Sequence, residues 1–131
     1  MSNEYSKILK YTFLVHFIVA VAFGLGYFFF PEVIMDITEW PIADLYVVRM
    51  LGAAFIAIGC TSILSFLETS WEKVKITVQL ELVWLVFGIL GGFWTLLEPI
   101  EYPLFALIGP LMLLAFLGGF GYSFYLEEFK K

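Results

Sequence analysis

The sequence predicts an all-α membrane protein built as a four-transmembrane-helix bundle, and three observations support this fold class. Of 131 residues, 62% are hydrophobic and 15% are charged, with a mean hydropathy of +0.95, whereas a soluble domain of this size carries more charge on its surface. Four apolar runs are each about 20–24 residues long, enough to cross a hydrocarbon core of roughly 30 Å. The runs are continuous rather than alternating, which argues against the strands of a membrane barrel. We therefore expect one membrane domain over residues 1–131.

The four predicted spans cover about residues 9–30, 45–67, 76–97 and 103–126. The first run is longer than the apolar segment of a secretory signal peptide. The bulky sequence 27–31 stands at its end, where a cleavage site requires small residues. We therefore expect the first run to be a retained helix.

The distribution of lysines predicts the orientation. All six lysines lie before or at the start of span one, between spans two and three, or after span four. With four spans, these segments share one side of the membrane. The lysines are Lys7, Lys10, Lys73, Lys75, Lys130 and Lys131. Because cytoplasmic segments are enriched in Lys and Arg, both termini are expected in the cytoplasm of a multi-pass plasma-membrane protein.

The first external connection, residues 31–44, has its own pattern. Apolar side chains recur there at helical spacing with acidic residues between them; the apolar ones are Val33, Ile34, Ile37 and Trp40. This pattern predicts a short amphipathic helix along the outer interface.

Three side chains that carry charge near neutral pH interrupt the spans: His16, Arg49 and Glu81. Charge inside hydrocarbon is costly and calls for a partner, a route to water or a function. His16 and Glu81 lie roughly 10 and 8 Å from the cytoplasmic ends of their spans, whereas Arg49 lies about 15 Å from Glu81 along the membrane normal. We therefore expect two separate sites.

The first is a polar intramembrane site at His16 and Glu81, completed by Gln79 and Thr61 in the same half of the membrane. Further candidates for this pocket in the same half are Ser62, Ser65, Tyr122 and Ser123. An imidazole and a carboxylate at one depth can share a proton or contact a ligand. An interhelical hydrogen bond that fixes the packing register is the competing interpretation.

The second is an external charge site at Arg49, with Asp44, Glu98 and Glu101 as candidate partners and Glu39 in the first external connection as another. A snorkelling arginine that ties the loops to the bundle is one interpretation. An anion or lipid-headgroup contact is the other. In span two, Arg49 shares a face with Ala53, Ala57 and Thr61, which we expect to be the packing face.

Metal, cofactor and nucleic-acid chemistry find no support in the sequence. One histidine and one cysteine cannot form a zinc site or a bis-histidine haem site within the chain. No basic patch interleaved with aromatic residues lies outside the spans. We therefore expect no metal, no cofactor, no nucleic-acid partner and no catalytic residues.

The segment from Gly24 to Gly59 carries a further pattern: Gly24-x-Gly26, Pro31, and Arg49-x-x-Gly52-Ala53. It resembles the DoxX-like group of small four-helix membrane proteins and allied families of unknown function. The resemblance implies a compact four-span bundle and indicates no activity.

Function therefore has three candidate classes. The first is a non-catalytic accessory, scaffold or lipid-binding bundle, whose partners are the bilayer, a second copy or another membrane protein. The alternative is an oligomeric transporter or channel for protons, cations or small molecules that uses His16 and Glu81. The third is an enzyme acting on a lipid or quinone with these residues as acid and base.

Overall fold

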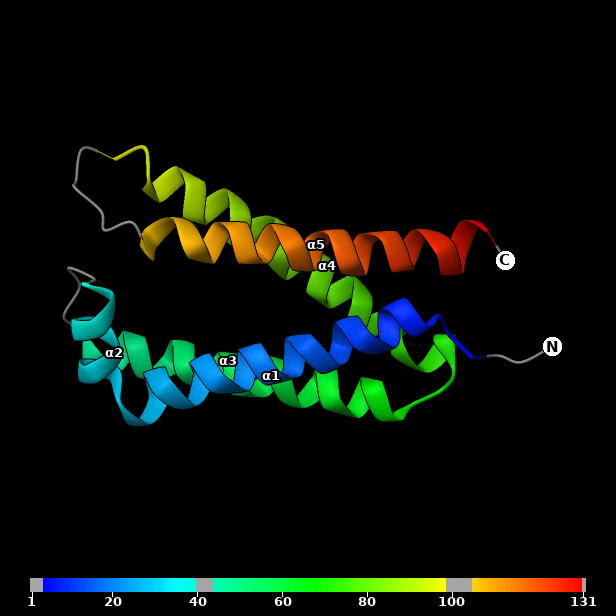
Figure 1. The fold of residues 1–131 in the computed structure, drawn as a ribbon, viewed down its shortest axis with the longest axis horizontal. Helices are drawn as coiled ribbons and strands as arrows, with labels where there is room; N and C mark the ends of the chain where they lie inside the picture. The colour runs from blue at the N-terminus through cyan, green and yellow to red at the C-terminus, as the bar shows by residue number, and fades with distance from the viewer. Residues whose placement is uncertain (1–3, 40–43, 99–104, 131) are drawn as a thin grey trace.

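The computed structural model describes residues 4–39, 44–98 and 105–130 and is helical almost throughout (Figure 1). The helices are α1 (Lys7–Phe29), α2 (Pro31–Thr38), α3 (Leu45–Leu67), α4 (Trp71–Thr95) and α5 (Phe105–Phe129). Four of them are long and apolar enough to cross a membrane, and they overlap the four apolar runs of the sequence. Helix α4 begins at Trp71 rather than at Ile76, because the charged residues of its first turns are good helix formers.

The helices form two antiparallel hairpins. Helices α1 and α3 pack along each other, α4 packs against α5, and the hairpins contact each other through α1 with α5 and through α3 with α4. Figure 1 shows both described ends of the chain at one end of the molecule and α2 at the opposite end. We refer to these as the terminal end and the loop end.

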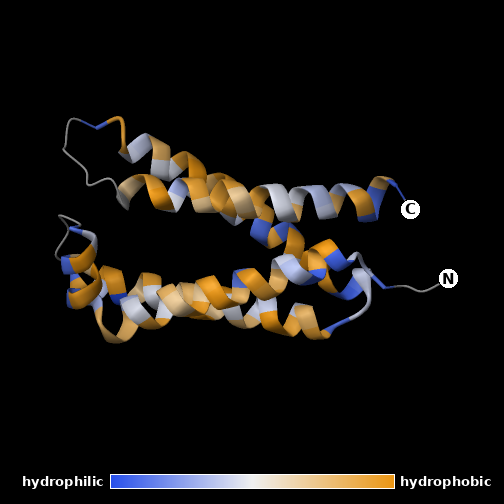
Figure 2. Cartoon of the chain, viewed as in Figure 1, coloured by the Kyte–Doolittle hydropathy of each residue, from blue (hydrophilic) through white to orange (hydrophobic). Residues whose placement is uncertain are grey.

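Much of the outward surface of the spans is apolar. Phe87 is 70% exposed and Leu90 is 59% exposed on α4, and Ile18 is 56% exposed on α1. Figure 2 shows that hydrophobic residues cover long stretches of the helices. Because an apolar surface of this extent is unfavourable in water and matches hydrocarbon, the exposed faces suit a lipid environment.

The contact between α1 and α3 is a close backbone approach at two glycines. A Cβ atom at Gly52 would lie 2.6 Å from the backbone nitrogen of Phe28 and 2.9 Å from the carbonyl oxygen of Gly24. No larger side chain fits there without separating the helices. Small residues therefore fix the spacing of this hairpin.

This contact also corrects the expected packing face of α3. The buried residues of α3 are Gly52, Gly59, Ser62 and Ser65. Ala57 and Arg49 are exposed instead. The closest approach is available only at glycine, so α3 is rotated to place its glycines, rather than its alanines, against α1.

The terminal end holds the apolar core that joins the hairpins. Leu9 and Phe13 of α1 pack there with Val78 and Leu85 of α4 and Phe120 of α5, and all five are fully buried. The large buried side chains that join the two hairpins therefore lie toward the chain ends.

Residues before α1 fasten this end further. The Tyr5 hydroxyl donates to the carbonyl of Ser65 at 2.6 Å, and the Ser6 backbone N–H donates to Glu127 Oε1 at 2.7 Å. Burial, with the Glu68 carboxylate nearby, raises the pKa of Tyr5 to about 12, so its phenol keeps its proton as a donor. The N-terminal segment thus ties α3 to α5.

We predict that Gly52→Ala destabilises the protein by about 1–3 kcal/mol, because the added methyl group overpacks the contact between α1 and α3. The measurement is the free energy of unfolding in a detergent titration followed by circular dichroism. Gly118→Ala is the matched control, since a Cβ atom at Gly118 meets nothing within 4 Å, and it should be neutral or stabilising by up to about 1 kcal/mol. Equal stability of the two variants would contradict the close-contact interpretation.

Candidate functional site

A buried polar cluster joins α1, α3 and α4. His16 Nδ1 lies 2.8 Å from Ser62 Oγ and 3.6 Å from Glu81 Oε1. The three residues are 4%, 0% and 1% exposed respectively. The first distance is a hydrogen bond, and the second is slightly longer than one.

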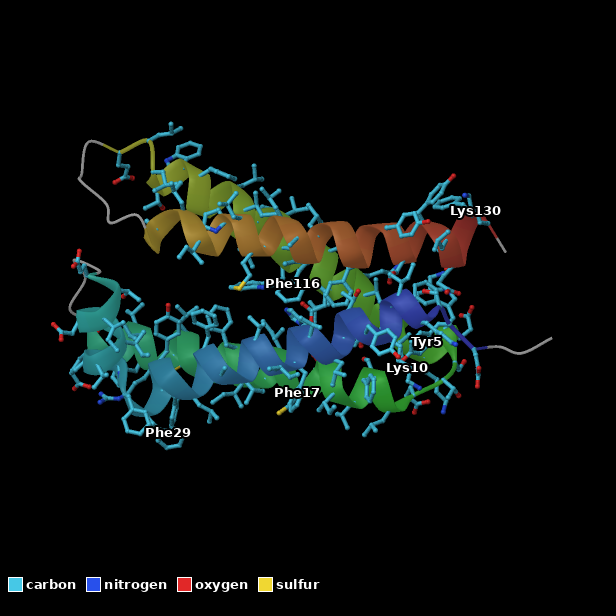
Figure 3. The ribbon with its side chains drawn as sticks, in the orientation of Figure 1. Tyr5, Lys10, Phe17, Phe29, Phe116 and Lys130 are labelled. Atoms are coloured by element: carbon cyan, nitrogen blue, oxygen red, sulfur yellow. The ribbon has the colours of Figure 1, made fainter. Side chains whose placement is uncertain are left out.

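Helix α5 completes the surroundings of the imidazole with aromatic rings. Phe116 and Phe120 both meet the His16 ring edge-on, with centroid distances of 4.7 and 5.4 Å. Figure 3 labels Phe116 between α5 and α1. All four spanning helices therefore converge at His16.

Glu81 is the least satisfied member of the cluster. Among the described residues, neither of its carboxylate oxygens makes a hydrogen bond. A buried carboxyl group without partners is costly, and the cost falls when it carries a proton or meets a donor. The His16 imidazole lies 3.6 Å from Glu81 Oε1, so a proton can be shared between the imidazole and the carboxyl group.

An apolar cleft of about 440 Å³ extends from the loop end to this cluster. His16 lies at its inner end, and Met35 and Thr38 of α2 lie at its outer end. The walls come from both hairpins and are mainly aliphatic and aromatic; they include Val19, Phe23, Phe55, Ile58, Trp84 and Leu113. None of the fully buried core residues of the terminal end lines it.

The polar groups along the cleft are few. The hydroxyls of Thr38 and Thr95 donate to carbonyls of their own helices, at 2.7 and 2.9 Å. Tyr27 contributes a phenol nearer the loop end. His16 is the polar side chain at the inner end.

Two of the predicted polar-site residues lie elsewhere. Gln79 is exposed on α4 and does not line the cleft. The Thr61 hydroxyl donates to the Ile58 carbonyl of its own helix at 2.7 Å. Ser62, adjacent to Thr61, occupies the position beside His16. Ser62 is one of the further candidates that the sequence places at this depth, and it lies three residues after Gly59 on the buried face of α3.

The external charge site has a different set of partners from the one expected. Arg49 Nη2 lies 3.8 Å from Glu32 Oε1 on α2, and both side chains are largely exposed. Asp44 instead caps α3, accepting from the backbone N–H of Tyr46 at 3.0 Å. Glu98 is exposed, and Glu101 lies outside the described residues. Because an exposed ion pair contributes little, this contact is a tether between α2 and α3 at most.

Within residues 4–39, 44–98 and 105–130, no group of three or more His, Cys, Asp or Glu residues could hold a metal ion. Cys60 is exposed on α3. The described residues can provide hydrogen bonding and proton exchange at His16, Ser62 and Glu81, next to an apolar cleft.

These features define a class: a multi-pass helical membrane protein with a buried polar cluster at the end of an apolar cleft. No protein-family model, curated protein or solved structure matches the chain. Its function is therefore inferred from the chemistry of the site.

We predict that Ser62→Ala lowers the free energy of unfolding by about 1–2 kcal/mol, because the imidazole loses its short hydrogen bond inside the membrane. The measurement is again a detergent titration. Ser123→Ala is the matched control: Ser123 is 0% exposed, and its hydroxyl makes no hydrogen bond with the described residues. Removing that hydroxyl should leave stability unchanged or improve it. A loss at Ser123 as large as that at Ser62 would show that the hydrogen bond to His16 is not the stabilising feature.

Proposed function

We propose that this protein is a non-catalytic membrane protein that binds one apolar or amphiphilic small molecule, such as a lipid, in the cleft between its two hairpins. The observation that carries the proposal is the cleft itself, about 440 Å³ in volume with mainly apolar walls. Small-molecule sites are typically concave, mostly apolar cavities of about 300–1,000 Å³ with a few placed polar groups.

The shape of the cleft supports a binding role. Its outer part reaches Met35, Thr38 and Leu96 at the loop end, and its inner end lies at His16 and Phe116. Beyond that end the packed core of Leu9, Phe13 and Phe120 fills the space between the hairpins. A site open at one end and filled at the other suits a molecule that enters, is held and leaves by the same route.

Proton-coupled transport is the second candidate, and the observation that favours it is the contact between His16 and Glu81. Buried ionisable pairs in membrane helices often belong to proton relays. Transport ranks second because the terminal end is packed. A path through the protein would need the apolar core at that end to open, or a second copy of the chain to complete it.

For the orientation, we propose that the terminal end lies in the cytoplasm and that α2 lies at the outer face of the plasma membrane. The lysines at the terminal end support this arrangement. On α2, Val33 and Ile37 are 52% and 62% exposed next to the exposed Glu32 and Asp36, a combination suited to a membrane interface.

We predict that Gly91→Phe reduces binding of a hydrophobic fluorescent probe about tenfold or more, because the new ring occupies the cleft. Gly91 lines the cleft, and a Cβ atom there meets nothing within 4 Å, so the substitution fills space without displacing a helix. Binding is measured by titrating the purified protein in nanodiscs.

Gly118→Phe is the matched control, since Gly118 has the same free space and does not line the cleft. It should leave probe binding unchanged. If both variants bind the probe as the original protein does, the cleft is not the binding site.

The orientation is tested with reporter fusions in a bacterial inner membrane. Alkaline phosphatase fused after Lys131 should be inactive, because it remains in the cytoplasm, whereas the same enzyme fused after Glu98 should be active. Green fluorescent protein at the two positions should give the opposite pattern. Phosphatase activity after Lys131 would reverse the proposed orientation.

A further inference from the structure

We infer that the molecule held in the cleft is an uncharged alcohol-type lipid, with its hydroxyl against His16 at the inner end and its apolar body toward the loop end. This inference rests on the proposed binding function and names the class of ligand. Three features of the cluster and cleft lead to it.

The first feature is the unused nitrogen of His16. Nδ1 is engaged by Ser62 at 2.8 Å and faces Glu81 at 3.6 Å. Among the described residues, the other ring nitrogen, Nε2, makes no hydrogen bond. Because His16 lines the cleft, Nε2 is the polar atom that an occupant can pair with at the inner end, and an occupant that leaves it unpaired forgoes a buried hydrogen bond.

The second feature is that, among the residues described along the cleft, no charged side chain is free to pair with a charged head group. His16 and Glu81 face each other, and Arg49 and Glu32 pair on the exposed surface near the loop end. A phosphate, carboxylate or ammonium group carried to the inner end would lose its hydration without a counter-charge of its own. The occupant's head group is therefore neutral.

The third feature is that Nε2 can be a donor or an acceptor, depending on which nitrogen carries the proton. A hydroxyl both donates and accepts, so it pairs with either form of the ring. A hydrocarbon pairs with neither. A single hydroxyl also occupies little of the space between Phe116 and the opposite wall, where the lining is otherwise apolar.

Two tryptophans allow a direct test with brominated probes, because bromine quenches indole fluorescence at short range. Trp84 lines the cleft, and Trp94 is 74% exposed on the outer face of α4. The part of the quenching that disappears in the Trp84→Phe variant comes from probe in the cleft. The part that disappears in the Trp94→Phe variant comes from probe dissolved in the surrounding lipid. The ratio of the two corrects for the different solubility of each probe in the bilayer.

The probes are bromoundecanol, bromoundecane and bromoundecanoate, each with terminal bromine, in nanodiscs at a pH where the acid is ionised. The cleft-to-lipid ratio should be about fivefold higher for the alcohol than for the alkane or the carboxylate, as expected for one buried hydrogen bond. In His16→Leu the alcohol and the alkane should give equal ratios. Ser123→Ala should keep the preference, since Ser123 is buried on α5 and does not line the cleft.

The outcomes separate the two proposals. Quenching of Trp84 by all three probes with equal ratios overturns the inference about the head group and leaves binding in the cleft standing. A higher ratio for the carboxylate overturns it in favour of an anionic ligand. If no probe quenches Trp84 more than it quenches Trp94, the proposed binding function is overturned. The ratios in the unmodified protein decide between these outcomes even if His16→Leu does not fold.

Discussion

The fold depends on one constraint: a histidine buried among four apolar helices must keep its hydrogen bond. His16 meets Ser62 on α3 at 2.8 Å and Glu81 on α4 at 3.6 Å, while two phenylalanines of α5 cover its ring. In hydrocarbon no water replaces a lost partner, so the helices that supply these groups are held in one register. The backbone contact at Gly24 and Gly52 supports the same register, because it sets the spacing and rotation at which Ser62 faces His16.

The cleft follows from how each hairpin closes on itself. At Gly92 a Cβ atom would lie 2.7 Å from Pro110 Cγ, so α4 and α5 approach closely toward the loop end. Helices α1 and α3 approach closely at Gly24 and Gly52 in the same half. Each hairpin thus packs tightly within itself, whereas the large buried side chains that join the hairpins gather at the terminal end. The space left between the hairpins is lined by whatever faces remain, which are apolar apart from a few hydroxyls and His16.

Hydropathy and length predicted the four spans, because a helix that crosses hydrocarbon must be apolar over about 20 residues. Comparing depths placed His16 and Glu81 at one level, and they lie in contact. Depth does not specify the face of a helix, which is why Gln79 was grouped with them although it points away from the cleft. The same limit applies to α3, because Thr61 and Ser62 lie at nearly the same depth. Only the rotation of α3, which places its glycines against α1, decides that Ser62 meets His16. The sequence does not specify how the connection between α1 and α3 folds back. In the structure this fold brings Glu32 on α2 to Arg49.

A structural role for the polar cluster and a role in binding are compatible, because they use different atoms. The stabilising contact is made by Nδ1 of His16 with Ser62, whereas Nε2 makes no hydrogen bond with any described residue. A histidine with a purely structural role could make its hydrogen bond equally well inside the terminal core, where Phe13 and Val78 are fully buried. His16 instead lies where that core ends and the cleft begins. A polar atom at the inner end of the cleft gives an amphiphilic occupant a preferred direction, because turning the occupant end for end places its apolar tail against Nε2 and leaves that nitrogen unpaired.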